Sequence, residues 1–522
     1  MPGRMSGTEK QWALRWAVII VGLTCLPYLV AWLLTPADAQ YTGLLINHYD
    51  GESYYAKMQQ GARGDWLFHL PFTSESHEGA FVYTFYLALG QLAGVLRLPI
   101  PWVYHLARAA GSLFLLLVAY RFMARFLDSV QIRRAAFLLL GFSAGFGWLL
   151  APLGLITADL WVAEGFTFLS MLVNPHFPLA IGLMLLVFIA VLDLQVKDGR
   201  TRQRLAGAAA ASLGLSFVHP IAVPIALVVL GLYSTLLAWQ TRRIPWPEVV
   251  GMGLATVAAA PVLISVLIAF STNTALVAWS EQNLTPSPPP WDYALAYGLI
   301  LVLALGGIKM ALRRRARTDL FLLGWVGGVV VLLYVPFALQ RRFITGLHLP
   351  LTVLAALGLE RLVWPRVQAR QRALVTGLLV GFTALSNLFV LLVSVSGVAQ
   401  GRPPLVMPAD EVAACTWLRQ NTAWTDTVLA PPGSGHFIPA WAGNRVVYGH
   451  PFETIDAESK ETEVAHFYSP DTTTIERRAL LNRYRVRYVY APLAASLDPA
   501  TLGLTPAWTG EEAILYRVEG TS

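Results

Sequence analysis

Residues 12–34 read WALRWAVIIVGLTCLPYLVAWLL, an apolar run in which Arg15 is the single charged side chain. An α-helix of roughly 20 residues crosses the hydrocarbon core of a bilayer, so this run is long enough to span one. Similar runs occupy residues 105–127, 135–156, 178–194, 205–218, 221–239, 249–270, 291–312, 320–339, 343–363 and 374–398. The sequence therefore predicts a multi-pass α-helical membrane protein with about eleven transmembrane helices.

The composition of the 522 residues agrees with this class. Hydrophobic residues make up 56% of the chain and charged residues only 13%, a balance that soluble globular proteins do not have. The formal net charge is +7, but residues 405–522 hold 9 Lys and Arg against 14 Asp and Glu, so the rest carries the excess of positive charge. This excess lies in short loops between apolar runs, as in cytoplasmic loops. There is no basic stripe with interleaved aromatic residues, so we expect no nucleic-acid partner.

The basic loops also predict the orientation. With the N-terminus in the cytoplasm, the loops assigned to the cytoplasm hold clusters such as Arg133-Arg134, Arg200 to Arg204, Arg313 to Arg317 and Arg366 to Arg372. Eleven spans then place the C-terminus outside. The apolar run at 80–98 would invert this topology if it spanned, so we interpret it as an interfacial segment. The predicted location is the plasma (inner) membrane.

The predicted domains are a transmembrane catalytic domain at 1–402, with a first outer loop at 35–103 that contains interfacial helices, and a soluble extracytoplasmic α/β domain at 403–522. In the second domain, periodicity predicts helices at 409–422 and 473–484, and strands at 427–430, 445–448, 486–490 and 513–518. Residues 433–436 are interpreted as a turn.

Candidate catalytic residues lie in the first outer loop. Asp50, Glu52 and Glu78 are carboxylates that could deprotonate a hydroxyl or hold a metal. Asp50 and Glu52 share a face only if the backbone is extended, because on a helix they diverge. Asp50, Glu52, His77 and Glu78 offer ligands for a divalent ion such as Mg²⁺ or Mn²⁺, but no spacing is diagnostic. No other cofactor is expected.

Cationic and imidazole side chains supply candidate substrate-binding residues. Arg341 and Arg342 follow the ninth predicted span on the outer side, where arginines are disfavoured. They could bind a phosphate through the planar guanidinium, or snorkel to ordinary head groups. His176 and His219 stand next to prolines at outer helix ends, where a cap or hinge is the alternative to a ligand.

The stretch from Asp50 to Trp66, then Glu78, the aromatic run Tyr83 to Tyr86 and the span with Arg108 resemble the N-terminal region of the GT-C superfamily of membrane glycosyltransferases. The resemblance is nearest to the aminoarabinose transferase and protein O-mannosyltransferase types. It implies interfacial helices before the second span and polyprenyl-phosphate sugars as donors. Tyr55, Lys57 and Arg108 lie in these stretches and are further candidate substrate-binding residues. Asn174-Pro175 stands where the aminoarabinose transferase type has Asp-Pro, so one carboxylate is missing here.

The resulting hypothesis is an inverting glycosyltransferase on the outer membrane face. A carboxylate, preferably Asp50, activates an acceptor hydroxyl, and the polyprenyl phosphate leaves toward Arg341 and Arg342. The expected partners are a polyprenyl-phosphate sugar, membrane lipids, and a lipid, protein or polysaccharide acceptor. Two other classes stay open: a polytopic transporter or lipid flippase, and a non-catalytic receptor with an outer domain.

Overall fold

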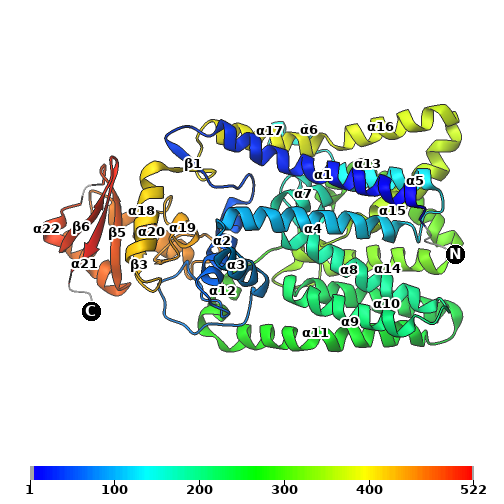
Figure 1. The fold of residues 1–522 in the computed structure, drawn as a ribbon, viewed down its shortest axis with the longest axis horizontal. Helices are drawn as coiled ribbons and strands as arrows, with labels where there is room; N and C mark the ends of the chain where they lie inside the picture. The colour runs from blue at the N-terminus through cyan, green and yellow to red at the C-terminus, as the bar shows by residue number, and fades with distance from the viewer. Residues whose placement is uncertain (1–4, 496, 520–522) are drawn as a thin grey trace. The chain divides into compact units, whose positions relative to one another are not determined.

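The computed structural model describes residues 5–495 and 497–519, which form two compact units. Unit 1 comprises the described residues up to Leu29, His105–Ile264 and Thr285–Ser394. Unit 2 comprises Val30–Tyr104, Ser265–Leu284 and the described residues from Val395 onward. Figure 1 gives the labels of the helices and strands.

Unit 1 is built from helices. Its elements, some of which extend into unit 2, are α1 (Gly7–Leu34), α4 (Ile100–Met123), α5 (Val130–Phe142), α6 (Gly147–Leu150), α7 (Thr167–Val173), α8 (His176–Leu192), α9 (Thr201–Val218), α10 (Ala222–Thr241), α11 (Trp246–Thr272), α13 (Pro290–Arg314), α14 (Arg317–Leu332), α15 (His348–Gly358), α16 (Arg372–Thr383) and α17 (Leu385–Ala399). Helices α8, α10 and α14 lie side by side (Figure 1). Buried aromatic residues fill the space between them: Phe321 and Trp325 of α14 contact Phe188 of α8.

In the described part of the chain, eight segments are long and apolar enough to cross a membrane. They are Gly7–Leu34, Ile100–Met123, Val130–Leu153, His176–Gln195, Ala222–Thr241, Trp246–Thr272, Pro290–Arg314 and Ala369–Ala399. Each coincides with a predicted span, so a multi-pass helical protein is confirmed but the number eleven is not. The other three predicted spans fall on α9, which has 18 residues, α14, which has 16, and α15, which has only 11.

The run predicted to be interfacial forms α3 (Thr84–Leu96), which has 13 residues. At 1.5 Å per residue such a helix is roughly 20 Å long, shorter than the hydrocarbon core of about 30 Å. It packs against α2 (His48–Ala62) through glycines. A Cβ atom on Gly61 would lie 2.1 Å from the carbonyl oxygen of Leu87, so the two backbones touch at a position that only glycine allows.

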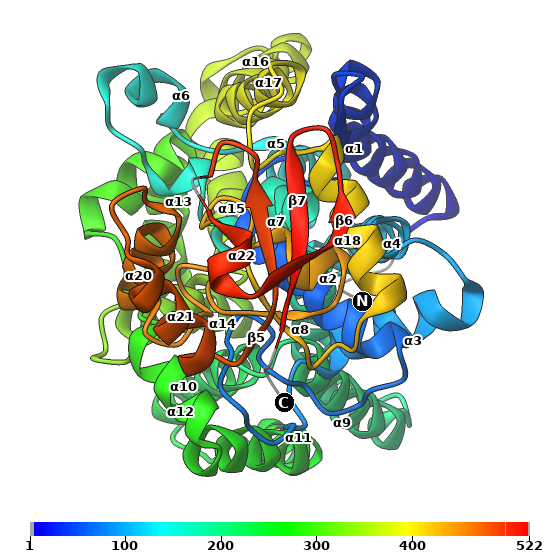
Figure 2. The same cartoon turned by 90° about the vertical axis from the view of Figure 1, so that its left-hand side faces the viewer.

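Unit 2 contains a five-stranded sheet with the order β4-β3-β5-β7-β6, whose last strands lie side by side in Figure 2. The strands are β3 (Thr427–Leu429), β4 (Arg445–Val446), β5 (Val486–Pro492), β6 (Leu504–Thr509) and β7 (Ala513–Val518). Strands β3, β4 and β5 pair in parallel, whereas β5–β7 and β7–β6 are antiparallel. A separate two-stranded ladder joins β1 (Ala39–Tyr41) to β2 (Val406–Pro408).

Helices cover both faces of this sheet. On one face, α18 (Ala409–Asn421) and α19 (Phe437–Trp441) pack on Tyr488 and Tyr490. On the other face, α20 (Ala457–Tyr468) and α21 (Thr474–Arg483) pack on Val489 and its neighbours. This alternation follows from the two-residue period of a strand. The remaining helices of unit 2 are α12 (Thr274–Gln282) and α22 (Pro499–Leu502).

The C-terminal elements agree closely with the prediction at several positions. The strand at 513–518 and the helices at 409–422 and 473–484 are observed within a residue of their predicted ends. Helix α20 and strand β6 were not predicted. The proposed division between residues 402 and 403 stays a prediction, because residues 30–104 and 265–284 also pack into unit 2.

Candidate active site

Helix α2 carries most of the predicted residues of the first outer loop. It begins after Asn47, which has a left-handed conformation, and ends at Ala62, two residues before Gly64 with φ of 105°. Its core-facing side chains contact α3 and α19. Because α2 is a helix, Asp50 and Glu52 point about 200° apart around its axis.

The two carboxylates consequently have different surroundings. Glu52 is fully buried, and Nε1 of Trp441 donates a hydrogen bond to its Oε2 at 3.1 Å. Burial raises the pKa of Glu52 well above its ordinary value, which favours the protonated acid. Asp50 is half-buried in the first turn of α2, where the helix dipole stabilises a negative charge. Asp50 is therefore the better placed of the two to act as a base on a bound molecule.

Three histidines that were not predicted as site residues gather near Asp50. The ring of Tyr49 lies 4.3 Å from that of His48, 5.5 Å from that of His436 and 5.6 Å from that of His450. Burial lowers the pKa of His48 to about 4, against an opposing effect of Asp50. Burial, with His48 and His450 nearby, lowers the pKa of His436 to about 3. Near pH 7 these two imidazoles are neutral.

Several polar atoms of this cluster are buried without a hydrogen-bond partner in the described chain: both ring nitrogens of His436, Nε2 of His450 and Oε2 of Glu453. The Nδ1 atom of His450 accepts hydrogen bonds from the backbone N–H groups of Phe452 and Glu453, each at 3.0 Å. A neutral His450 therefore carries its proton on Nε2. Unpaired buried polar groups are uncommon and often mark positions where water or a ligand binds.

Lys57 lies beside this cluster and is almost completely buried. Its ammonium group pairs with Oε1 of Glu453 at 2.8 Å and donates to the hydroxyl of Ser53. It also stands 4.5 Å from the centre of the Tyr83 ring. Burial would raise the pKa of Glu453, but Lys57, His450 and the hydrogen bonds outweigh it, and the pKa lies below its ordinary value. Lys57 thus holds α2 to the segment around Glu453.

The other predicted residues of this loop are dispersed. Tyr55 is buried with its ring edge-to-face against Tyr104, and it lines a cavity of about 300 Å³ together with Trp441 and Arg419. Glu78 is exposed, and its backbone carbonyl accepts a hydrogen bond from Asn273.

The residues suggested for a divalent ion do not fit one. Nε2 of His77 accepts from the backbone N–H of Leu70 at 2.8 Å, and its Nδ1 lies 2.8 Å from the carbonyl of Glu75, so both ring nitrogens are occupied. Across the residues that the structure describes, no group of three or more His, Cys, Asp or Glu side chains is arranged to hold a metal ion.

The remaining predicted residues belong to unit 1. Arg108 is buried in α4, where it donates to the carbonyl of Met171 at 2.7 Å and lies 4.5 Å from the centre of the Tyr28 ring. The rings of His176 and His219 are 5.1 Å apart. Burial lowers the pKa of His219 to about 3, and the charge of Arg342 lowers it further. Three predicted residues, His176, His219 and Arg342, thus form a second cluster.

Arg341 points elsewhere. Arg341 and Arg342 are adjacent within the short 3₁₀ helix at Gln340–Ile344, so their side chains point in different directions. Arg341 lies 3.8 Å from Oε1 of Glu164 and 4.6 Å from the centre of the Trp161 ring. The carboxylate of Glu164 therefore offsets part of the charge of Arg341.

Comparisons with solved structures identify the fold. ArnT from Cupriavidus metallidurans matches in its apo state with a TM-score of 0.56 and 15% identity over 96% of this chain and 97% of that one. The same protein bound to undecaprenyl phosphate matches with a TM-score of 0.55, also at 15% identity, over 97% and 99%. The chain has the fold of the GT-C membrane glycosyltransferases.

A second structure with this fold is the Archaeoglobus fulgidus oligosaccharyltransferase tethered to an acceptor peptide with an NVT sequon. It matches with a TM-score of 0.53 and 17% identity, over 91% of this chain and 69% of that one. No family model matches the sequence, and a search of curated proteins finds no match either. The resemblance seen in the first outer loop is thus confirmed at the level of the fold.

Proposed function

We propose that this protein is a membrane glycosyltransferase that moves a sugar from a polyprenyl-phosphate donor to an acceptor hydroxyl on the outer membrane face. The observation that carries the proposal is the half-buried Asp50, on a helix of the first outer loop and beside neutral histidines, in a chain with the GT-C fold. The bound undecaprenyl phosphate of the ArnT structure supports the class of donor.

In this mechanism Asp50 accepts the proton of the acceptor hydroxyl as its oxygen attacks the anomeric carbon. The bond from that carbon to the phosphate oxygen breaks with inversion, and the phosphate keeps the electron pair. A general base of this kind contributes roughly 10²- to 10⁴-fold. Neutral imidazoles of His48 and His436 can orient hydroxyls because each has one donor and one acceptor nitrogen.

The departing phosphate needs a positive charge. We assign this role to Arg342, because its positive charge lies near His219, whose ring is 5.1 Å from that of His176. A planar guanidinium can donate two parallel hydrogen bonds to a phosphate. The two assignments rest on separate clusters, one in each unit, and each is testable alone.

The test is to incubate the solubilised full-length protein with a panel of polyprenyl-phosphate sugars and to measure released polyprenyl phosphate. Release that needs both a donor and an acceptor extract supports a glycosyltransferase. Binding of the lipid without any release, together with its movement across vesicle bilayers, would instead identify a transporter or flippase.

A further inference from the structure

A polar cavity of about 690 Å³ lies between the first outer loop and helices α20 and α21, all within unit 2. This volume is in the range of about 300–1,000 Å³ found for small-ligand sites. Residues of the loop at Ser74–Ser76 form one wall, and the ends of α20 and α21 form the other. None of the residues proposed above for catalysis lines this cavity.

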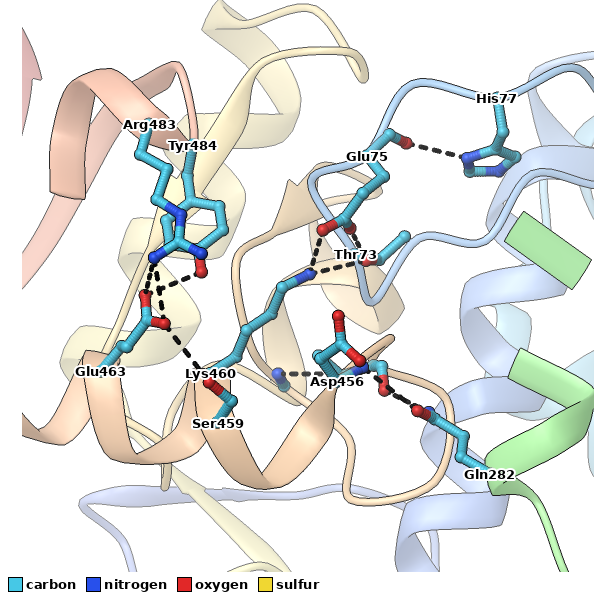
Figure 3. A network of polar contacts seen from close by, with 12 residues as sticks. Thr73, Glu75, His77, Gln282, Asp456, Ser459, Lys460, Glu463, Arg483 and Tyr484 are labelled. Atoms are coloured by element: carbon cyan, nitrogen blue, oxygen red, sulfur yellow. Dashed lines mark hydrogen bonds and ion pairs between the residues drawn. The ribbon is translucent and has the colours of Figure 1, made fainter. Parts of the chain in front are cut away.

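A connected network shapes the cavity (Figure 3). Lys460, whose side chain is 3% exposed, donates to Glu75 at 2.5 Å and to the hydroxyl of Thr73 at 3.1 Å. On the other side, Glu463 accepts from the hydroxyl of Tyr484 at 2.8 Å and pairs with Arg483 at 3.2 Å. These contacts hold side chains from distant parts of the sequence in fixed positions around one space.

Two charged groups at the cavity have no such contacts. In the described chain, neither the carboxylate of Asp456 nor the guanidinium of Arg485 makes a side-chain hydrogen bond or ion pair, and both are exposed. Both residues also have a positive φ, 54° and 49°, so the backbone turns sharply at each of them on the edge of the cavity. They are available to a molecule from solution.

The charges exclude several classes of ligand. Glu75, Asp456 and Glu463 balance Lys460, Arg483 and Arg485, so the lining has no net charge. A strong polyanion such as nucleic acid would need a basic surface, and a cation would need an acidic one. The other lining residues are serines and Tyr484, with no aliphatic side chain for a hydrophobic peptide anchor.

We propose that this cavity binds a neutral saccharide, the sugar portion of the acceptor. Sugar hydroxyls both donate and accept, so neighbouring acids and bases can satisfy them at once. Hydrogen bonds from a hydroxyl to an ionised side chain are about twice as strong as neutral ones. The role as acceptor site rests on the proposed glycosyltransferase activity, whereas saccharide binding does not.

The experiment measures binding of maltohexaose, mannohexaose and chitohexaose to the full-length protein by isothermal titration calorimetry, in a detergent without a sugar head group. At least one should bind, and Asp456→Asn and Arg485→Gln should each weaken it about 5- to 10-fold. Asparagine suits the left-handed conformation at position 456, so the fold should be kept. Arg478→Gln, at an exposed position of α21 outside the cavity, is the matched control and should bind like the wild type.

Three results would overturn the proposal: no binding of any of these sugars, equal loss in Arg478→Gln and Arg485→Gln, or tighter binding of a sulfated oligosaccharide than of the neutral ones. Binding by a protein that transfers no sugar would keep this inference and remove the proposed function. Sugar transfer with an unchanged KM for the acceptor in both cavity variants would keep the proposed function and remove this inference.

Discussion

Asp50 and Glu52 are separated by one glycine, yet Asp50 is half-buried whereas Glu52 is fully buried. Asp50→Asn keeps the size of the side chain and removes the base, so turnover should fall by at least about 10²-fold. The measurement is release of polyprenyl phosphate under saturating donor and acceptor, with the amount of folded protein checked by gel filtration.

Glu78→Gln is a suitable control for this substitution. Glu78 lies in the same loop but is exposed, so its loss should change turnover by less than about 3-fold. If Asp50→Asn turned over like the wild type while Glu78→Gln did not, the base would have to be moved to Glu78.

The adjacent arginines allow a second test at the residue scale. Lysine keeps the charge but loses the planar fork of the guanidinium. We expect Arg342→Lys to raise the KM for the donor about 10-fold, and Arg341→Lys to have a smaller effect because Arg341 is already beside Glu164 and Trp161. Steady-state kinetics with a polyprenyl-phosphate sugar decide between them. Wild-type kinetics in both variants would indicate ordinary snorkelling and remove the pair from the site.

At the scale of elements, the packing of α2 against the turn before α19 predicts a dependence of stability on pH. The folded pKa of His436 is about 3, below the value of about 6.5 for an unfolded histidine. Below about pH 6.5 the unfolded chain therefore binds a proton that the folded chain does not, and stability falls as the pH falls. Each pH unit in this window removes about 1.4 kcal/mol.

His436→Phe should remove this loss. Between pH 7.5 and pH 5 the Tm of the variant should fall by several degrees less than that of the wild type, since about 1 kcal/mol corresponds to a few degrees. Intrinsic fluorescence during heating measures both. His466→Phe, at an exposed position of α20, should keep the wild-type slope. An unchanged slope in His436→Phe would show that this imidazole is solvated.

Elements with a strong local pattern could be predicted from the sequence. The strand at Ala513–Val518 is apolar apart from Arg517, which is its one exposed residue, and its ends are those expected. Strand β6 was missed because it contains Pro506, which argues against a central strand; β6 is tolerated because it lies at the edge of the sheet. Helix α20 has no clear apolar period, with Glu458, Lys460 and Glu463 interrupting it.

The ends of the membrane segments show a different limit. Hydropathy predicted a span at 320–339, but α14 ends at Leu332, four residues before Pro336, and α15 begins only at His348. The hydropathy of a segment reports its partition into lipid and does not show where a helix ends inside a bundle.

The cluster of His48, His436 and His450 could not be predicted from the sequence. These residues are far apart in the chain, and only the packing of α2 on the C-terminal segment brings them together.

At the scale of the whole molecule, the orientation in the membrane is the prediction on which the outer-face reaction depends. Arg315 lies between α13 and α14, Arg313 and Arg314 end α13, and Arg317 begins α14. Positive charges favour the cytoplasmic side. Helix α3 is too short to span, so it should not reverse the segments that follow it. From both arguments we expect the C-terminus to lie outside.

Reporter fusions test this orientation directly. At the C-terminus, fused alkaline phosphatase should be active and fused green fluorescent protein should be dark. Between Arg315 and Ala316, inserted alkaline phosphatase should be inactive and inserted green fluorescent protein should fluoresce. Insertions between Asp198 and Gly199, in another basic loop, should agree with the second position and serve as the internal control. A fluorescent C-terminal fusion would mean that the chain crosses the membrane an even number of times. Asp50 could then remain outside, but the saccharide cavity would be divided, because Ser74–Ser76 and α20 could not share one side of the membrane.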